Sequence, residues 1–268
     1  MKQIDSFHHL AAPARAADHD RYLCSLFLPS RARAASFTLI LFNAEIARVF
    51  EAVSEPMLGQ IRLQWWREAI DEIYQGGGRK HEVAEPLARA IRRHNFTRSY
   101  FDRLIDAREM DLAAAPPEDM AALENYAEES AAPLISLSLE VMGADADAQL
   151  ELARHTGIGW ALSGLMRALP HHTAQGRALL PGGIPAREEV PRVVETVGDM
   201  ARQHIDKARA LRRQATRGVK RATLPAVLAD AYLSRLAACG YDPYNPGSAI
   251  GPLRRQLLLS RAAFLGLS

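Results

Sequence analysis

The chain has 268 residues, of which 48% are hydrophobic and 24% charged, proportions typical of a globular protein with a sizeable core and not of a disordered chain. Its 33 basic and 31 acidic residues leave a formal net charge of +2. Binding to nucleic acid needs a clustered basic excess, so this balance gives no reason to expect a nucleic-acid partner.

Cysteine usage and the N-terminal residues bear on the compartment. Cys24 and Cys239 are far apart and belong to no CxxC or Cys/His cluster, which favours a reducing environment. The N-terminus lacks the apolar core of a secretory signal, and charged residues interrupt every apolar stretch well short of the ~20 residues that span a bilayer. We therefore expect a cytoplasmic protein, and the Ala/Arg-rich composition suggests a bacterial source.

Apolar spacing predicts helices along the whole chain. Leu39, Phe42, Ile46, Val49 and Val53 follow at steps of three or four, one stripe of a helix that begins near residue 31. The segment 54–56, Ser-Glu-Pro, predicts a new helix start, and the three glycines at 76–78 predict its end. Further helices are predicted at about 85–94, 98–113, 120–141, 145–169, 187–217, 224–238 and 252–265, with a loop at 171–187. No convincing alternation predicts a strand. We expect one all-α domain spanning residues 1–268, with residues 1–17 as a flexible N-terminal segment.

Generic catalytic and metal motifs are missing from the sequence. It has no P-loop, no GxGxxG, no GxSxG and no HExxH. His171 and His172 are the best metal candidates, but adjacent residues on a helix diverge by about 100° and no third ligand is evident. Glu45, Glu51 and Glu55 do not share a helix face. We therefore predict no metal site.

Several longer segments resemble one family. The sharpest is Gln64-Trp65-Trp66-Arg67-Glu68, within a stretch from 53 to 70 that follows stretches at 22–29 and 37–51. Weaker matches follow at 104–112, 125–130 and 175–181. Together, and in this order, they resemble the squalene/phytoene synthase superfamily across about residues 20–185.

That resemblance implies a bundle of helices around an apolar central cavity, with two facing aspartate-rich segments. Active members of the superfamily join two prenyl diphosphates there. Diphosphate leaves only when its developing charge is neutralised, and Mg²⁺ held by carboxylate oxygens does this. Aspartates four residues apart place both carboxylates on one helix face.

The first of these segments departs from the family pattern. Its two aspartate positions fall on Ala47 and Glu51, and Arg48 stands where a further aspartate often follows. Only Glu51 retains a carboxylate.

The second segment departs further. The Asn and the two Asp of the pattern fall on Gly164, Ala168 and His172, while Arg167 and Arg177 are retained. One carboxylate opposite an arginine and a histidine does not hold a Mg²⁺ cluster, so the resemblance implies a fold without the metal chemistry. We expect no catalytic residue and no cofactor, with Mg²⁺ needed only if the chain is active after all.

Within the superfamily, the segments 42–45, 53–55, 64–68 and 93–97 look closest to a branch that also lacks the aspartates and includes a mitochondrial assembly factor for respiratory complex I. This resemblance implies a non-catalytic role in maturing a respiratory NADH dehydrogenase, with a protein client and peripheral contact at the inner face of a membrane. Two alternatives stay open. One is an active Mg²⁺-dependent prenyl transferase that uses Glu51 as a remaining ligand.

The other alternative is a module that binds an isoprenoid or another lipid. Arg48, Arg167, His172 and Arg177 would then pair with an anionic head group, and Tyr126 matches a position near the family's cavity. The same basic residues would otherwise neutralise nearby acids such as Glu45 or Glu51. If instead the acids at 106, 109 or 111 converge on the vacated segments, a relocated metal site becomes credible.

Overall fold

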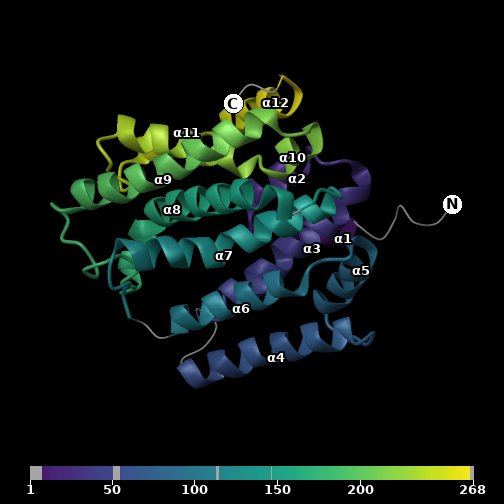
Figure 1. Ribbon diagram of the computed structural model, residues 1–268. Coiled ribbons are helices and arrows are strands. Elements are labelled where there is room, and N and C mark those ends of the chain that lie inside the picture. Colours follow the sequence, from purple (N-terminus) through teal and green to yellow (C-terminus); the bar gives the residue numbers. More distant parts are fainter. Residues whose placement is uncertain (1–7, 51–54, 113–114, 146, 266–268) are drawn as a thin grey trace.

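A computed structural model describes residues 8–50, 55–112, 115–145 and 147–265 (Figure 1). In these ranges the chain forms α-helices and two short 3₁₀ turns, with no strand. The helices are α1 (His8–Ala17), α2 (His19–Ser25), α3 (Ser30–Ala47), α4 (Pro56–Tyr74), α5 (Ala84–His94), α6 (Arg98–Leu112), α7 (Met120–Val141), α8 (Leu150–Ala174), α9 (Val190–Gln214), α10 (Arg217–Ala222), α11 (Pro225–Ala238) and α12 (Pro252–Leu265). The predicted all-α class is confirmed.

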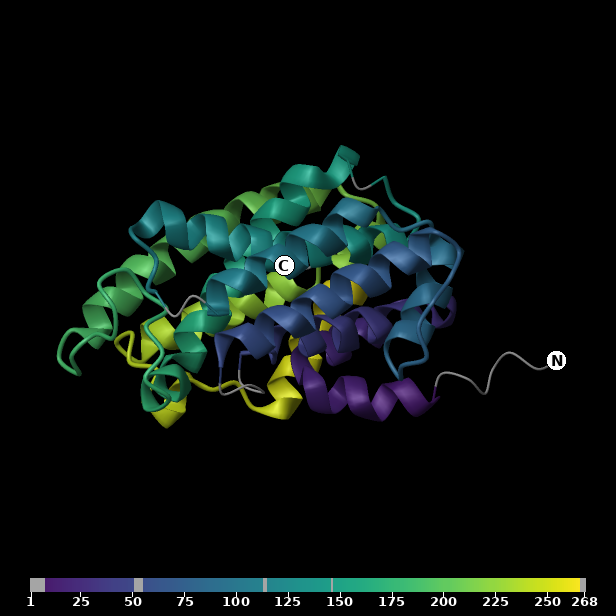
Figure 2. The same ribbon diagram turned by 90° about the horizontal axis from the view of Figure 1, so that it is seen from below.

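Helix α7 lies between two apolar clusters and explains how the bundle holds together. Ile135 and Leu139 belong to a cluster shared with α8, α9 and α11, whereas Leu134 and Leu137 belong to one shared with α3, α4, α5 and α6. A helix segment that is apolar on all sides is buried, as residues 130–137 of α7 are here. α4 forms one edge of the bundle and α9 and α11 the opposite edge (Figure 1), so α4 lies in front in the view from below (Figure 2).

The contact between α7 and α8 is unusually close at one point. A Cβ atom added to Gly157 of α8 would lie 2.5 Å from the backbone nitrogen of Ala132 in α7. Only a glycine lets the two helix backbones approach so closely. This contact fixes α8 against α7, and thereby fixes the second of the two vacated segments in the bundle.

The prediction of a flexible segment over residues 1–17 is wrong for its second part. Residues 1–7 lie outside the described ranges, but His8–Ala17 forms helix α1, which packs on α3. Leu10 and Ala14 are buried against Phe37 and Ile40. The alanines of this segment have high helix propensity, and packing on α3 stabilises the helix.

The predicted end of α8 at residue 169 is also wrong, because the helix continues through Pro170 to Ala174. A proline inside a helix removes one hydrogen bond and costs about 3 kcal/mol. Met166 and Leu169 in the turn before Pro170 are buried, and this packing offsets that cost. His171 and His172 therefore lie in the last turn of α8 and not in a loop.

Both cysteines are free, with Cys24 buried. No helix within the described ranges combines the length and the apolar character needed to cross a membrane.

Candidate functional site

The first vacated segment lies at the C-terminal end of α3. Ala47 is the last residue of the helix, and Arg48, which caps it, is exposed. Glu51, the one retained carboxylate, lies outside the described residues. At position 47 the aspartate of the family pattern is replaced by an alanine, which has no carboxylate.

The second vacated segment lies in the last third of α8. Gly164, Ala168 and His172 are four residues apart and so share one face of the helix. A Cβ atom built on Gly164 would meet no other atom within 4 Å. The helix face that would carry the metal ligands in the family pattern is open at Gly164 and bears no acidic side chain.

A buried polar cluster lies beside this face, around the carboxylate of Asp111 at the end of α6. Tyr126 of α7 donates a hydrogen bond to Asp111 Oδ1 over 2.8 Å, and Arg177 Nη2 lies 3.3 Å from the same oxygen. Arg108 Nη1 lies 3.3 Å from Asp111 Oδ2 and also 3.3 Å from the Tyr126 hydroxyl oxygen. We call these four residues the Asp111 cluster.

The Asp111 cluster brings the ends of both vacated segments together. The Arg177 guanidinium lies 4.2 Å from the centre of the Phe50 ring, just beyond the end of α3. His172 lies close enough to feel the same charges: burial, with Arg177 and His171 nearby, lowers the pKa of His172 to about 4. Two of the residues predicted to contact an anion, Tyr126 and Arg177, therefore meet here on a carboxylate of the protein.

These residues do not fit the Mg²⁺ ions of the family pattern. The carboxylate of Asp111 already accepts from two arginines and a tyrosine, so both of its oxygens are engaged by the protein itself. Asp106 and Glu109 are exposed and pair instead with Arg67 of α4. In the described part of the chain, no three His, Cys, Asp or Glu side chains are grouped to hold a metal ion. Of the alternatives left open above, a relocated metal site around Asp111 therefore has no support in the geometry.

A second buried aspartate, Asp20 of α2, holds the other retained arginine. Tyr232 of α11 donates to Asp20 Oδ2 over 2.7 Å, and Arg255 of α12 donates to Asp20 Oδ1 over 2.6 Å. Arg167 Nη2 lies 3.4 Å from Asp20 Oδ2, and the Arg167 guanidinium sits 3.4 Å above the centre of the Tyr232 ring. We call these four residues the Asp20 cluster; it ties the N-terminal part of the chain to its last helix.

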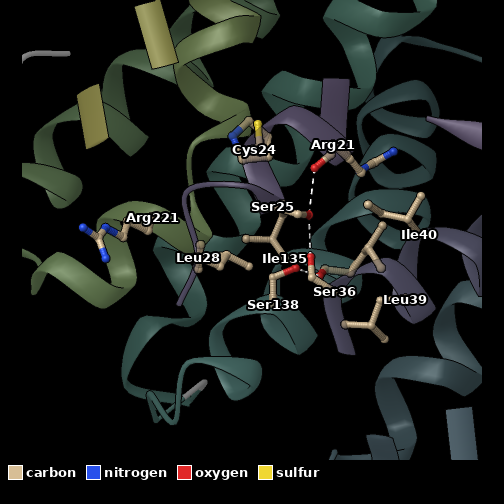
Figure 3. A pocket seen from close by; sticks show the side chains of 13 residues that line it. Arg21, Cys24, Ser25, Leu28, Ser36, Leu39, Ile40, Ile135, Ser138 and Arg221 are labelled. Atoms are coloured by element: carbon tan, nitrogen blue, oxygen red, sulfur yellow. Dashed lines mark hydrogen bonds between the residues drawn. The ribbon is translucent and has the colours of Figure 1, made fainter. Parts of the chain in front are cut away.

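The apolar interior between α2, α3, α7 and α10 holds only a small cavity (Figure 3). Its volume is about 30 Å³, far below the ~300 Å³ at which pockets for organic ligands begin. Ser25 donates to the Arg21 carbonyl oxygen over 2.9 Å, and the Ser25 and Ser36 hydroxyl oxygens are 2.6 Å apart. Leu39, Ile135 and their neighbours fill the rest, so this cavity as it stands has room for water and not for an isoprenoid chain.

Sequence reasoning missed most partners in the two clusters. Asp111 was noticed only as a metal ligand, although Arg108 and Asp111 are three residues apart on a helix and such spacing is a recognisable ion-pair signal. Asp20 and Tyr232 are 212 residues apart, and no local pattern signals their contact. Arg48, which is also predicted to contact an anion, belongs to neither cluster. Its role stays a prediction.

Comparison with known proteins gives the family. The family model described as squalene/phytoene synthase matches residues 14–263 of this chain. The chain belongs to the squalene/phytoene synthase family. A curated cattle (Bos taurus) relative, "NADH dehydrogenase (ubiquinone) complex I, assembly factor 6", is 32% identical over 246 residues, which cover 87% of this chain and 74% of the relative. Such relatives give no support to the expected bacterial source.

Two solved members of this family have the same fold. A dehydrosqualene synthase in complex with a ligand has a TM-score of 0.81 at 15% identity, covering 97% of this chain and 96% of that one. The squalene synthase HpnC from Alicyclobacillus acidocaldarius has a TM-score of 0.77 at 20% identity, covering 89% of this chain and 95% of that one. At such identities the likeness concerns the fold alone.

Proposed function

We propose that this chain binds a protein client and helps to assemble a respiratory NADH dehydrogenase, and that it does not transfer prenyl groups. One observation carries the proposal. Carboxylates are missing at Ala47, Gly164 and Ala168, and the nearby carboxylate of Asp111 is already engaged by the protein's own arginines. The cattle relative, which is named as an assembly factor of complex I, supports the choice of client.

The chemistry argues in the same direction. Departure of a diphosphate requires several hard cations held by carboxylate oxygens, and Mg²⁺ demands near-octahedral oxygen coordination. Arg108 and Arg177 flank the Asp111 carboxylate, so a metal ion there would meet positive charge. The proposed role needs neither metal nor cofactor, and it places the protein at the inner face of the membrane where its client resides.

Two exposed apolar surfaces are candidates for contact with the client. On α4, Met57 and Ile61 are 68% and 59% exposed. On α12, Leu253, Leu257 and Phe264 are exposed by 65% or more. Exposed apolar side chains that gather on one helix are typical of protein-binding surfaces.

The experiment is deletion of the gene in the source cell, followed by complementation. We expect the deletion strain to lose assembled NADH dehydrogenase and its activity. The wild-type chain and the Glu51→Gln variant should both restore it, because Glu51→Gln removes the last carboxylate of the first segment and the role needs no metal. Normal assembly in the deletion strain would end the proposal.

Surface variants then locate the client. Met57→Glu with Ile61→Glu, and separately Leu253→Glu with Leu257→Glu, leave the core intact because all four side chains are exposed. We expect one pair to abolish complementation and co-purification of the client and the other to have no effect. Equal complementation by both pairs would mean that neither helix contacts the client.

Prenyl transfer is tested directly in vitro. The purified chain is incubated with farnesyl or geranylgeranyl diphosphate and Mg²⁺, and we expect no squalene- or phytoene-like product. Product that disappears in the Glu51→Gln variant would replace the proposal with the active-enzyme alternative.

A lipid-binding role has one observation in its favour. In the Asp111 cluster two arginines face one aspartate, so the largely buried cluster carries an excess positive charge that would attract an anionic head group. Native mass spectrometry after gentle extraction tests it. A co-purified lipid that is lost in the Arg177→Gln variant would support this role, and a ligand-free mass would exclude it.

A further inference from the structure

A recess between α1, α3 and α5 lies outside the vacated segments and outside both clusters. Its volume is about 400 Å³, within the ~300–1,000 Å³ range of pockets that bind small organic ligands. It is roughly an order of magnitude larger than the cavity of Figure 3, at about 30 Å³. α1, α3 and α5 lie side by side at the end of the molecule where the described chain begins (Figure 1).

Small apolar side chains form the floor of this recess, where α3 packs against α5. Ala34, Ala35, Ala90 and Pro86 are buried there, and Leu10 of α1 closes one side. Small residues at a helix contact leave volume that larger ones would fill. The one hydroxyl on the floor, that of Thr38, already donates to the Ala34 carbonyl oxygen over 2.9 Å. The floor therefore suits an apolar group.

The rim is strongly basic, and its positive charge is not neutralised by neighbouring acids. It carries four arginines and a histidine: Arg31 from α3 and Arg89, Arg92, Arg93 and His94 from α5. Among the described residues, no carboxylate lies within ion-pair distance of any of these four guanidinium groups.

The arginines of the rim differ from those arginines of the chain that are held in ion pairs. Arginines such as Arg67, Arg103 and Arg154 each pair with two acids. Arg89 and Arg93, by contrast, are one turn apart on α5, where like charges repel and destabilise the helix. A bound anion would relieve this repulsion.

We propose that this recess binds an organic phosphate, with the phosphate held by the arginines of the rim and its apolar substituent on the alanine floor. Arginine forks match phosphate oxygens in pairs, which favours phosphate over a single carboxylate at a rim with four guanidinium groups. Two sources share this chemistry, the head group of an anionic phospholipid and a soluble phosphorylated metabolite. The site does not depend on the assembly role proposed above.

The test uses the full-length chain and calorimetric titration with hexyl phosphate, inorganic phosphate and hexanol. We expect hexyl phosphate to bind at one site and at least about tenfold more tightly than inorganic phosphate, because each buried methylene contributes roughly a fourfold gain. Hexanol, which lacks the charge, should show no measurable binding.

Three variants separate the site from general electrostatics. Arg89→Glu with Arg93→Glu should weaken hexyl phosphate at least about tenfold, since hydrogen bonds to a charged group are lost. Arg192→Glu, an exposed arginine of α9, is the matched control and should change nothing. Ala90→Leu keeps every charge but fills the floor, so it should abolish the advantage of hexyl phosphate over inorganic phosphate.

Vesicles distinguish the two sources. The ligand is a lipid head group if vesicles of phosphatidylcholine and phosphatidic acid bind the wild type but not the Arg89/Arg93 variant, and if hexyl phosphate competes with them. If only hexyl phosphate shows this dependence, the ligand is a soluble phosphate. Hexyl phosphate binding that is equal in wild type and the Arg89/Arg93 variant, or equally weakened by Arg192→Glu, would overturn the proposal. So would a poly-glutamate peptide that occupies the rim and is not displaced by hexyl phosphate.

Discussion

The Asp111 and Asp20 clusters contain the same side chains, one aspartate, two arginines and one tyrosine, but differ in how far water reaches them. Around Asp111 both arginine side chains are nearly buried, with Arg108 and Arg177 at 12% and 10% exposure. Around Asp20, Arg167 is 34% exposed and rests on the Tyr232 ring. Arg167 and Arg177 thus both have carboxylates of the protein as partners, in place of the anionic head group that the lipid-binding alternative would give them.

This difference predicts the largest effect in the molecule. Asp111→Asn keeps the shape of the side chain but leaves two buried arginines without a counter-charge, which we expect to lower the free energy of unfolding by about 3–5 kcal/mol. Asp20→Asn should cost less, about 1–3 kcal/mol, because Arg167 can turn toward water and keeps its contact with Tyr232.

Urea denaturation of the two variants measures this difference. The control is Asp106→Asn, whose carboxylate is 62% exposed and pairs with Arg67 at the surface, so it should cost less than about 1 kcal/mol. Equal losses for Asp111→Asn and Asp20→Asn would show that exposure of the arginines does not set the cost.

How far the sequence predicts these arrangements depends on the distance over which each interaction acts. Helix periodicity is local, so α7 (Met120–Val141) and α12 (Pro252–Leu265) lie where apolar spacing places them. The continuation of α8 through Pro170 depends on packing against α7 and α9, which no local pattern contains. The positions of the two vacated segments rest on the family resemblance and stay a prediction.

The partners in the clusters were not legible in the same way. The sequence left two alternatives for Arg177, an external anion or a nearby acid such as Glu45 or Glu51. In the structure it pairs with Asp111, which is 66 residues away. A carboxylate that is remote in sequence cannot be assigned to an arginine by spacing, since the assignment requires the packing of α6, α7 and the segment after α8.

An effect of intermediate size is a dependence of stability on pH that arises beside the Asp111 cluster. Among the described residues, His172 lies next to this cluster, and one of the cluster's arginines shifts its pKa. Burial and Arg177 lower the pKa of His172 to about 4 from its ordinary value of 6.5. As the pH falls from 6.5 toward 4, the unfolded chain takes up a proton at this residue and the folded chain does not. Stability is therefore lost as the pH falls through this window, and the loss levels off below it.

The measurement is urea denaturation of wild type and His172→Gln at pH values across that window. We expect the variant to lose stability less steeply with falling pH than the wild type. His155 contributes in the same direction, since burial and the neighbouring His204 lower the pKa of His155 to about 4, so His155→Gln serves as a positive control. An unchanged slope in His172→Gln would mean that His172 is protonated equally in both states.

The smallest effect concerns the two tyrosine hydroxyls. Tyr126→Phe removes a donor to Asp111 and an acceptor for the largely buried Arg108. Tyr232→Phe removes a donor to Asp20, and Asp20 still accepts from Arg255. We expect a loss of about 1–2 kcal/mol for Tyr126→Phe and about 0.5–1 kcal/mol for Tyr232→Phe.

The cation–π contact of Arg167 explains why the second value is small, because a phenylalanine ring at position 232 still presents its face to the guanidinium. Tyr22→Phe is the control: its ring stacks on Phe37 at 5.3 Å, a contact that the variant keeps, so stability should be unchanged. Thermal or urea unfolding resolves differences of this size. If Tyr232→Phe proves the more costly of the two, then the Asp20 cluster is the tighter one, and the order predicted for Asp111→Asn and Asp20→Asn must reverse with it.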